Sequence, residues 1–199
     1  MPTASSTPRT SAPSNWSEVP RPQPPSGCRQ VVGAPGSVLH PGPATATGRL
    51  VMADALVLAV EEGVDAIVNI ATLTGQCLRT LGEEVAGLYA NNDALAAQVS
   101  AAAELTDEQV WRLPLIRSYR KELDSDIADI KNIGGANAGS IHAGLFLEEF
   151  VDGVPWAHLD IAGTAQSSAA ASWLNKGPTA FGARLLIELA LGFAPSAQD

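Results

Sequence analysis

The stretch Gly48-Arg49-Leu50-Val51-Met52-Ala53-Asp54-Ala55-Leu56 lies at an abrupt change in the composition of this 199-residue chain. Beyond it, apolar residues recur with helical spacing as far as Glu62, on one face made of Leu50, Ala53, Leu56, Val57 and Val60. Gly63 then gives a stop signal. The β-branched run at 66–70 follows directly and is typical of a buried parallel strand. A helix joined in this way to a buried strand predicts an α/β fold.

The rest of the chain continues the alternation of helix and strand patterns. Further strands are predicted at 85–90 and 156–161, and further helices directly after 72–75 and at 93–105, 118–123, 140–151 and 179–191. Asp93 is the predicted N-cap of the helix over 93–105, because its carboxylate can accept from N–H groups of the first turn. Strands that alternate with helices indicate a mixed, mostly parallel sheet sandwiched between helices.

The N-terminal stretch has a different character. Ten of the 14 prolines lie at or before Pro43, Glu18 is the only acidic residue there, and no period of 2 or 3.6 can be traced. Such a segment buries too little apolar surface to offset the entropy lost on ordering. We therefore predict a disordered or irregular Pro-rich segment over 1–43 and a folded domain over 44–199.

Charge and cysteine content exclude several classes of protein. The net charge of −9 and the pI of about 4.7 argue against a nucleic-acid surface, which needs clustered Lys and Arg. No apolar run is long enough to span a membrane, and the first residues lack the apolar core of a secretory signal. Cys28 and Cys77 form neither a disulfide framework nor a zinc motif, which predicts a cytoplasmic location.

Five blocks, in order, give the chain a resemblance to the leucyl aminopeptidases, the cytosol aminopeptidase family. They are residues 48–56, Ile70-Ala71-Thr72-Leu73-Thr74-Gly75, Trp111-Arg112-Leu113-Pro114-Leu115, Asn132-Ile133-Gly134-Gly135, and Trp156-Ala157-His158-Leu159-Asp160-Ile161-Ala162-Gly163-Thr164-Ala165. Together they resemble the C-terminal portion of the family's catalytic domain, over roughly residues 44–193.

The resemblance implies a site and a reaction. The family removes N-terminal residues, preferably Leu, from peptides, with two divalent metals (Mn or Zn) that activate water and polarise the scissile carbonyl. Family members are hexamers, so the expected partners are peptides with a free N-terminus and further copies of the chain. Arg49 matches the family's catalytic arginine, whose forked donors suit a carbonate and an oxyanion. Residues matching the family's substrate contacts are Thr72, Leu73, Gly75, Ala162 and Ala165.

The loop before Arg49 departs from the family pattern. Aligned on Gly48-Arg49-Leu50, Thr45 stands where the family has a metal-binding Asp, and Thr47 stands where it has a Glu. A two-metal site needs hard anionic oxygens, and a neutral hydroxyl is a poor ligand. The family also takes metal-binding Lys and Asp residues from upstream, whereas 1–43 contain neither residue type. No metal ligand is therefore predicted in this chain.

Three interpretations follow: an active aminopeptidase, an inactive homologue that serves as a structural or peptide-binding subunit, and a chain whose reading frame is wrong upstream of Gly48. His158 and Asp160 stand two apart on one predicted strand and favour a structural role. His142 is predicted to be packed or half exposed rather than catalytic. Residues 134–140 lack the Gly-Lys-Ser/Thr ending of a phosphate loop and predict a glycine-rich connection to a helix.

Overall fold

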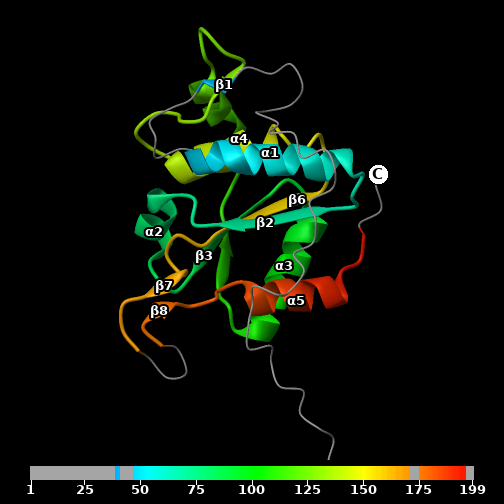
Figure 1. Cartoon of the computed structure of the whole chain (residues 1–199), viewed down its shortest axis with the longest axis vertical. Helices are drawn as coiled ribbons and strands as arrows, with labels where there is room; N and C mark the ends of the chain where they lie inside the picture. The colour runs from blue at the N-terminus through cyan, green and yellow to red at the C-terminus, as the bar shows by residue number, and fades with distance from the viewer. Residues whose placement is uncertain (1–38, 41–46, 171–174, 196–199) are drawn as a thin grey trace, which may run out of the picture. The chain divides into compact units, whose positions relative to one another are not determined.

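The computed structural model describes residues 39–40, 47–170 and 175–195. All of these residues lie in one compact unit, within Val31–Asp199. Within that unit the predicted fold class is confirmed, because a mixed, mostly parallel sheet lies between helices (Figure 1). The predicted boundary between 1–43 and 44–199 lies outside the described residues and stays a prediction.

The main sheet has four strands in the order β2-β6-β3-β4. Strand β2 (Ile67–Ala71) is parallel to β6 (Trp156–Asp160), which is antiparallel to β3 (Ala86–Ala90). Strand β3 is in turn parallel to β4 (Val110–Arg112). Since β6 and β3 run in opposite directions, the carboxyl ends of β2 and β6 share one edge of the sheet with the starts of β3 and β4.

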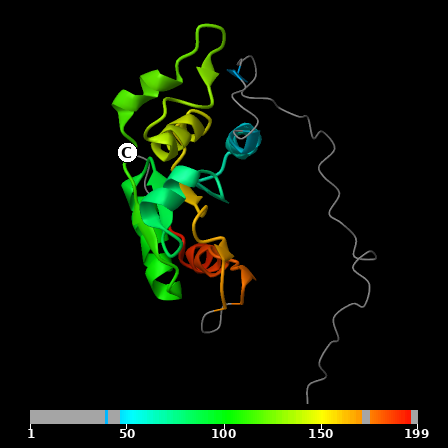
Figure 2. The ribbon, with the colours of Figure 1, turned by 90° about the vertical axis from the view of Figure 1, so that its left-hand side faces the viewer.

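Helices cover both faces of this sheet (Figure 1). Helices α1 (Thr47–Glu61) and α4 (Gly139–Glu148) lie on one face, and α3 (Asp93–Thr106) and α5 (Ala183–Gly192) lie on the other. Figure 2, turned by 90°, shows α1 nearly end-on. The first core is centred on Leu56, Phe146 and Trp156, and the second on Leu88, Val99, Leu159 and Leu185. The alternation of side chains along β6 assigns Trp156 to one core and Leu159 to the other.

Shorter elements complete the unit. Helix α2 (Gly75–Leu81) follows β2, and the 3₁₀ helix η3 (Arg117–Leu123) follows β4. Strands β1 (Leu39–His40) and β5 (Ile130–Lys131) form a parallel pair, and β7 (Gln166–Ser167) and β8 (Gly177–Pro178) form an antiparallel pair. No helix in the described part of the chain is long and apolar enough to cross a bilayer.

One predicted N-cap and one predicted helix start are wrong. The N-cap of α3 is Asn92, whose side chain accepts from the Leu95 N–H at 2.9 Å, so Asp93 is the first helical residue. The last helix begins at Ala183 and not at 179, because Ala180 and Gly182 have positive φ angles of 55° and 89°. Left-handed residues cannot continue a right-handed helix.

Candidate active site

The site begins where β2 and β6 end side by side. Ala71 is in register with Asp160, and the Ile161 N–H donates to the Ala71 carbonyl at 2.9 Å. The loops that leave these strands therefore start next to one another at the same edge of the sheet. In α/β sheets, the region beyond the carboxyl ends of parallel strands is where ligands usually bind.

The Asp160 carboxylate joins the two loops. Its Oδ1 accepts from the backbone N–H groups of Leu73 at 3.1 Å, Thr74 at 3.3 Å and Ala162 at 3.2 Å. Its Oδ2 accepts from the Thr74 hydroxyl at 2.6 Å. The same hydroxyl accepts from the Cys77 N–H at 3.1 Å and so caps α2. Burial raises the pKa of Asp160, and these hydrogen bonds oppose the rise.

Arg49 lies across from this loop, on the first turn of α1. Its Nη1 donates to the Asn132 carbonyl at 2.5 Å and its Nη2 to the Gly139 carbonyl at 3.2 Å. The residue is only 9% exposed. Burial lowers the pKa of the guanidinium, and the negative charge of Asp160 partly offsets this effect. Arg49 thus fixes both ends of the glycine-rich segment 132–139.

A cleft of about 200 Å³ separates the two loops. Its lining consists of Arg49, Leu73, Thr74, Gly75, Gln76, Ile133, Gly134, Gly135 and Gly139. Four of these described lining residues are glycines, and the only charged side chain among them is the cation of Arg49. Helix α4 begins at this cleft with no side-chain cap on its first turn, which leaves backbone N–H groups at its end.

The catalytic-domain model of the cytosol aminopeptidase family matches residues 43–187, which include the whole cleft. The chain belongs to the cytosol aminopeptidase family. It is 48% identical over 170 residues to a probable cytosol aminopeptidase of Synechococcus sp. (strain JA-3-3Ab), over 78% of this chain and 33% of that protein. It is also 48% identical over 156 residues to one from Chlorobium luteolum, over 77% and 30%. The chain spans about a third of the length of these relatives.

The structure brings together part of the predicted site of this family member. Arg49, Leu73 and Gly75 line the cleft, whereas Thr72 is exposed just before it. Ala162 and Ala165 lie on the loop after β6 and do not line the cleft, although the Ala162 N–H shares the Asp160 carboxylate with Leu73. Thr45 lies outside the described residues, and Thr47 is the first residue of α1.

Sequence reasoning missed two contributions. Asp160 was interpreted only as a sheet residue, yet its carboxylate organises the loops. The signal was available, because an acid that ends a predicted parallel strand is placed at the functional edge of the sheet. The glycine-rich segment was interpreted as a connection, and Gly134, Gly135 and Gly139 prove to line the cleft. An alanine Cβ at 134 would lie 2.5 Å from His142 Nδ1, so this close approach requires glycine.

The family implies two divalent metals, and the donor set of the cleft does not fit them. None of the lining residues is Asp, Glu, His or Cys. Both oxygens of nearby Asp160 already accept hydrogen bonds. Within the described ranges, no three or more such side chains come together where they could hold a metal ion. A dinuclear site needs several anionic oxygens, so the residues that line this cleft do not fit a metal pair.

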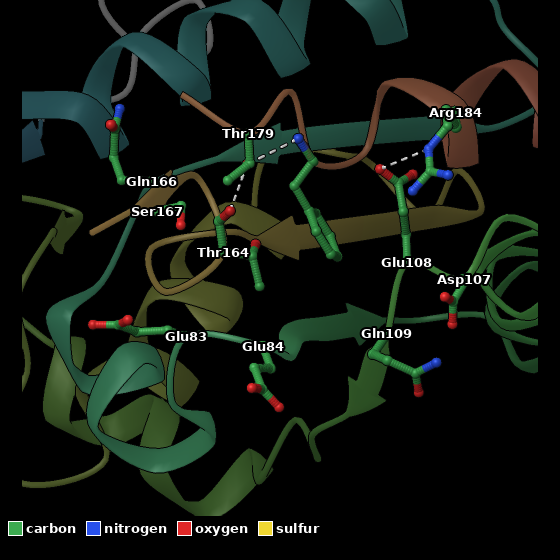
Figure 3. Close-up of a pocket in the computed structure, with 11 residues that line it drawn as sticks. Glu83, Glu84, Asp107, Glu108, Gln109, Thr164, Gln166, Ser167, Thr179 and Arg184 are labelled. Atoms are coloured by element: carbon green, nitrogen blue, oxygen red, sulfur yellow. Dashed lines mark hydrogen bonds and ion pairs between the residues drawn. The ribbon is translucent and has the colours of Figure 1, made fainter. Parts of the chain in front are cut away.

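A larger pocket of about 340 Å³ opens at the same edge of the sheet, where β3 and β4 begin (Figure 3). Glu83, Glu84 and Asp107 are exposed acids on its wall. Glu108 is buried and accepts from the N–H groups of Gly182 at 3.0 Å and Leu185 at 2.8 Å, at the start of α5. The buried acid is thus an N-terminal helix anchor, and none of the residues predicted for catalysis lines this pocket.

Proposed function

We propose that this chain provides the substrate-binding side of a leucyl-aminopeptidase-type site, that it receives peptides with a free, Leu-type N-terminal residue, and that it does not hold the metal pair itself. The observation that carries the proposal is the composition of the Arg49 cleft, in which a buried cation and backbone groups face one another without a carboxylate in the lining. Such a cleft can orient a peptide, but it cannot neutralise two dications.

The chemistry of the cleft supports a binding role. A guanidinium carries five N–H donors, and the contacts with Asn132 and Gly139 use two of them. A fixed cation in a site with little water interacts strongly with a carbonyl or carboxylate oxygen. Leu73 and Ile133 add apolar surface for a leucine-sized side chain. We therefore assign to Arg49 the orientation of the backbone oxygen of a bound peptide.

A two-metal hydrolase is the second candidate, and the 48% identity to probable cytosol aminopeptidases favours it. It requires that a different reading frame upstream of Gly48 encode the Asp-x-Glu loop and a segment rich in Lys and Asp. Translation of the coding DNA in all three frames around codon 47 decides this point. The absence of both features from every frame would leave only the substrate-binding proposal.

The test uses the purified chain after incubation with Mn²⁺ or Zn²⁺ and removal of loosely bound ions. We expect far fewer than about two ions per chain and no hydrolysis of leucine 4-nitroanilide. Titration with leucinamide, followed through the amide resonances of Leu73 and Gly75, is expected to show saturable binding. The variant Arg49→Lys should weaken it, and the exposed control Arg112→Lys should not. Two retained ions together with turnover would overturn the proposal.

Location and assembly belong to the same proposal. We place the chain in the cytoplasm and expect it to form a homo-oligomer, a hexamer by family resemblance, with no nucleic acid and no membrane as partner. Light scattering of the purified chain measures the mass of the assembly directly. If the measured mass is that of a monomer at all concentrations, the proposed homo-oligomer is wrong, and the proposal for the cleft is unaffected.

A further inference from the structure

The two groups of predicted substrate residues come from segments about ninety residues apart, and a single side chain joins them. Leu73 and Thr74 follow β2, and Ala162 follows β6. Their three backbone N–H groups all point at Oδ1 of Asp160, at 3.1, 3.3 and 3.2 Å. Beyond the pairing of the strand ends, one carboxylate oxygen therefore bonds both loops.

The surroundings of this atom explain why a carboxylate stands there. Every polar group that the structure shows bonded to the Asp160 side chain is a donor: three backbone N–H groups and the Thr74 hydroxyl. An ionised carboxylate only accepts, and its two oxygens offer about four lone-pair sites. An asparagine at this position would place the two N–H donors of its side-chain amide against neighbours that are themselves donors. The residue is 1% exposed, so water cannot replace a lost partner.

The arrangement also extends into the cleft. The Thr74 hydroxyl, which donates to Asp160, also accepts from the Cys77 N–H in the first turn of α2. Thr74 and Gly75 themselves line the cleft. Across the cleft, the positive charge of Arg49 interacts with Asp160. The carboxylate is thus connected to both loops on its own side of the cleft and to the cation on the other.

We propose that Asp160 is the positioning residue of the substrate pocket: its carboxylate fixes the loop 73–76 against the loop 161–165 and thereby sets which first side chain the pocket accepts. The role of the pocket rests on the proposed function, whereas the fixing of the loops does not. Asp160 itself does not line the cleft and acts through the backbone of Leu73, Thr74 and Ala162.

The test compares matched variants by amide hydrogen exchange. Asp160→Asn keeps the shape of the side chain and removes the acceptor-only character. Thr74→Val removes one donor to the carboxylate, Thr74→Ser retains it, and Thr80→Val makes the same change at an exposed residue of α2 whose hydroxyl bonds only the Gln76 carbonyl in the structure. We expect exchange at Leu73, Thr74 and Ala162 to become about tenfold faster or more in Asp160→Asn. The Val99 amide, in α3 on the other face, should be unchanged.

Binding supplies the readout that a purely structural role would not change. The wild-type chain should prefer leucinamide to phenylalaninamide, and Asp160→Asn and Thr74→Val should lose most of that preference, by about tenfold. Thr74→Ser and Thr80→Val should keep it. Unchanged exchange at Leu73 and Ala162 in Asp160→Asn, or an equal rise at Val99, would overturn the positioning role.

The two proposals fail in different ways. If the wild-type chain binds neither amide, the proposed function is overturned, and the exchange pattern still decides whether Asp160 fixes the loops. If the wild-type chain binds but all variants keep the same preference, the proposed function survives and the positioning role is overturned. Faster exchange at the three amides together with a lost preference supports both.

Discussion

The two sides of the Arg49 cleft are held by opposite charges. On one side, the loop 73–76 is fixed by Asp160, which accepts hydrogen bonds from backbone N–H groups; we refer to it as the acid-tied wall. On the other side, the segment 133–139 is fixed by Arg49, which donates to the carbonyls of Asn132 and Gly139; we refer to it as the base-tied wall. Each buried charge has backbone groups of a loop as its hydrogen-bond partners.

The two walls differ in how completely they are fixed. The acid-tied wall has four donors on a carboxylate that is 1% exposed. Arg49 donates two hydrogen bonds to the base-tied wall, which includes Ala138, whose φ of 54° is unfavourable for a residue with a side chain. Local opening starts where fewer buried bonds hold the backbone. We therefore expect the base-tied wall to open first and the acid-tied wall to open only with the core.

The largest expected effect is the loss of the acid. Asp160→Ala leaves three backbone N–H groups and the hydroxyl proton of Thr74 without an acceptor in a buried place, so we expect a loss of about 4 kcal/mol in the free energy of unfolding. Urea denaturation of variant and wild type measures the difference. The control Asp93→Ala removes an acid whose side chain is 92% exposed and should cost about 0.5 kcal/mol.

If Asp160→Ala does not fold, Asp160→Asn provides the measurement, with an expected loss of about 2 kcal/mol because a neutral amide is the weaker acceptor. If the loss in the free energy of unfolding is no larger than that of Asp93→Ala, the Asp160 carboxylate does not hold the two loops together. The two walls would then be held with similar strength, and the comparison would lose its basis.

The two buried histidines make the free energy of unfolding depend on pH, and to different extents. His158, on β6, is fully buried with its ring between those of Tyr89 and Trp156, and burial lowers its pKa to about 3. Below the unfolded-state pKa of about 6.5, the unfolded chain takes up a proton that the folded chain refuses. Stability is therefore lost as the pH falls from about 6.5 toward 3, by about 1.4 kcal/mol per pH unit from this one group.

His142, beneath the base-tied wall, should contribute less to this loss. Burial lowers the pKa of His142 as well, but Glu122 Oε2 lies 3.4 Å from Nε2 and opposes the shift. In unfolding curves between pH 4 and 6, His158→Gln should flatten the slope by about one proton and His142→Gln by only a fraction of one. Equal slopes for wild type and His158→Gln would show that the histidine on β6 is protonated in the folded chain.

Local patterns were sufficient for much of the fold. The β-branched run of β2 and the apolar spacing of α1 identify these elements, and the apolar residues of α4 identify a helix that is buried on nearly every side. The short strand β4 was missed, since Trp111 and Arg112 are largely exposed and three residues give no period. The start of α5 was misplaced because the pairing of β7 with β8 and the left-handed Gly182 precede it.

The candidate site was predictable only in part for the same reason. Arg49 was found through a continuous motif, and the structure places it in the cleft with Leu73 and Gly75. The role of Asp160 depends on contacts across more than eighty residues, which no local pattern contains. Gly134 was recognisable as a loop residue, but its contact with the His142 ring needs the packing of α4 against the loop.

The smallest expected effect concerns the base-tied wall. Arg49→Met keeps the apolar stem and removes the bonds to the Asn132 and Gly139 carbonyls. Each lost bond is worth roughly 1 kcal/mol, but a buried charge also no longer has to be desolvated, so we expect a net loss of about 1 kcal/mol. Urea denaturation measures it, with Arg112→Met, a half-exposed arginine paired to Asp93, as the control.

A double-mutant cycle of Arg49→Met with Asp160→Asn then asks whether the walls are independent. The two charges interact across the cleft without a direct bond in the structure, so the coupling free energy should be below about 1 kcal/mol. A coupling near the full cost of Asp160→Asn would mean that the acid is kept mainly for the cation opposite, and that one ion pair, rather than two separate backbone ties, holds the cleft together.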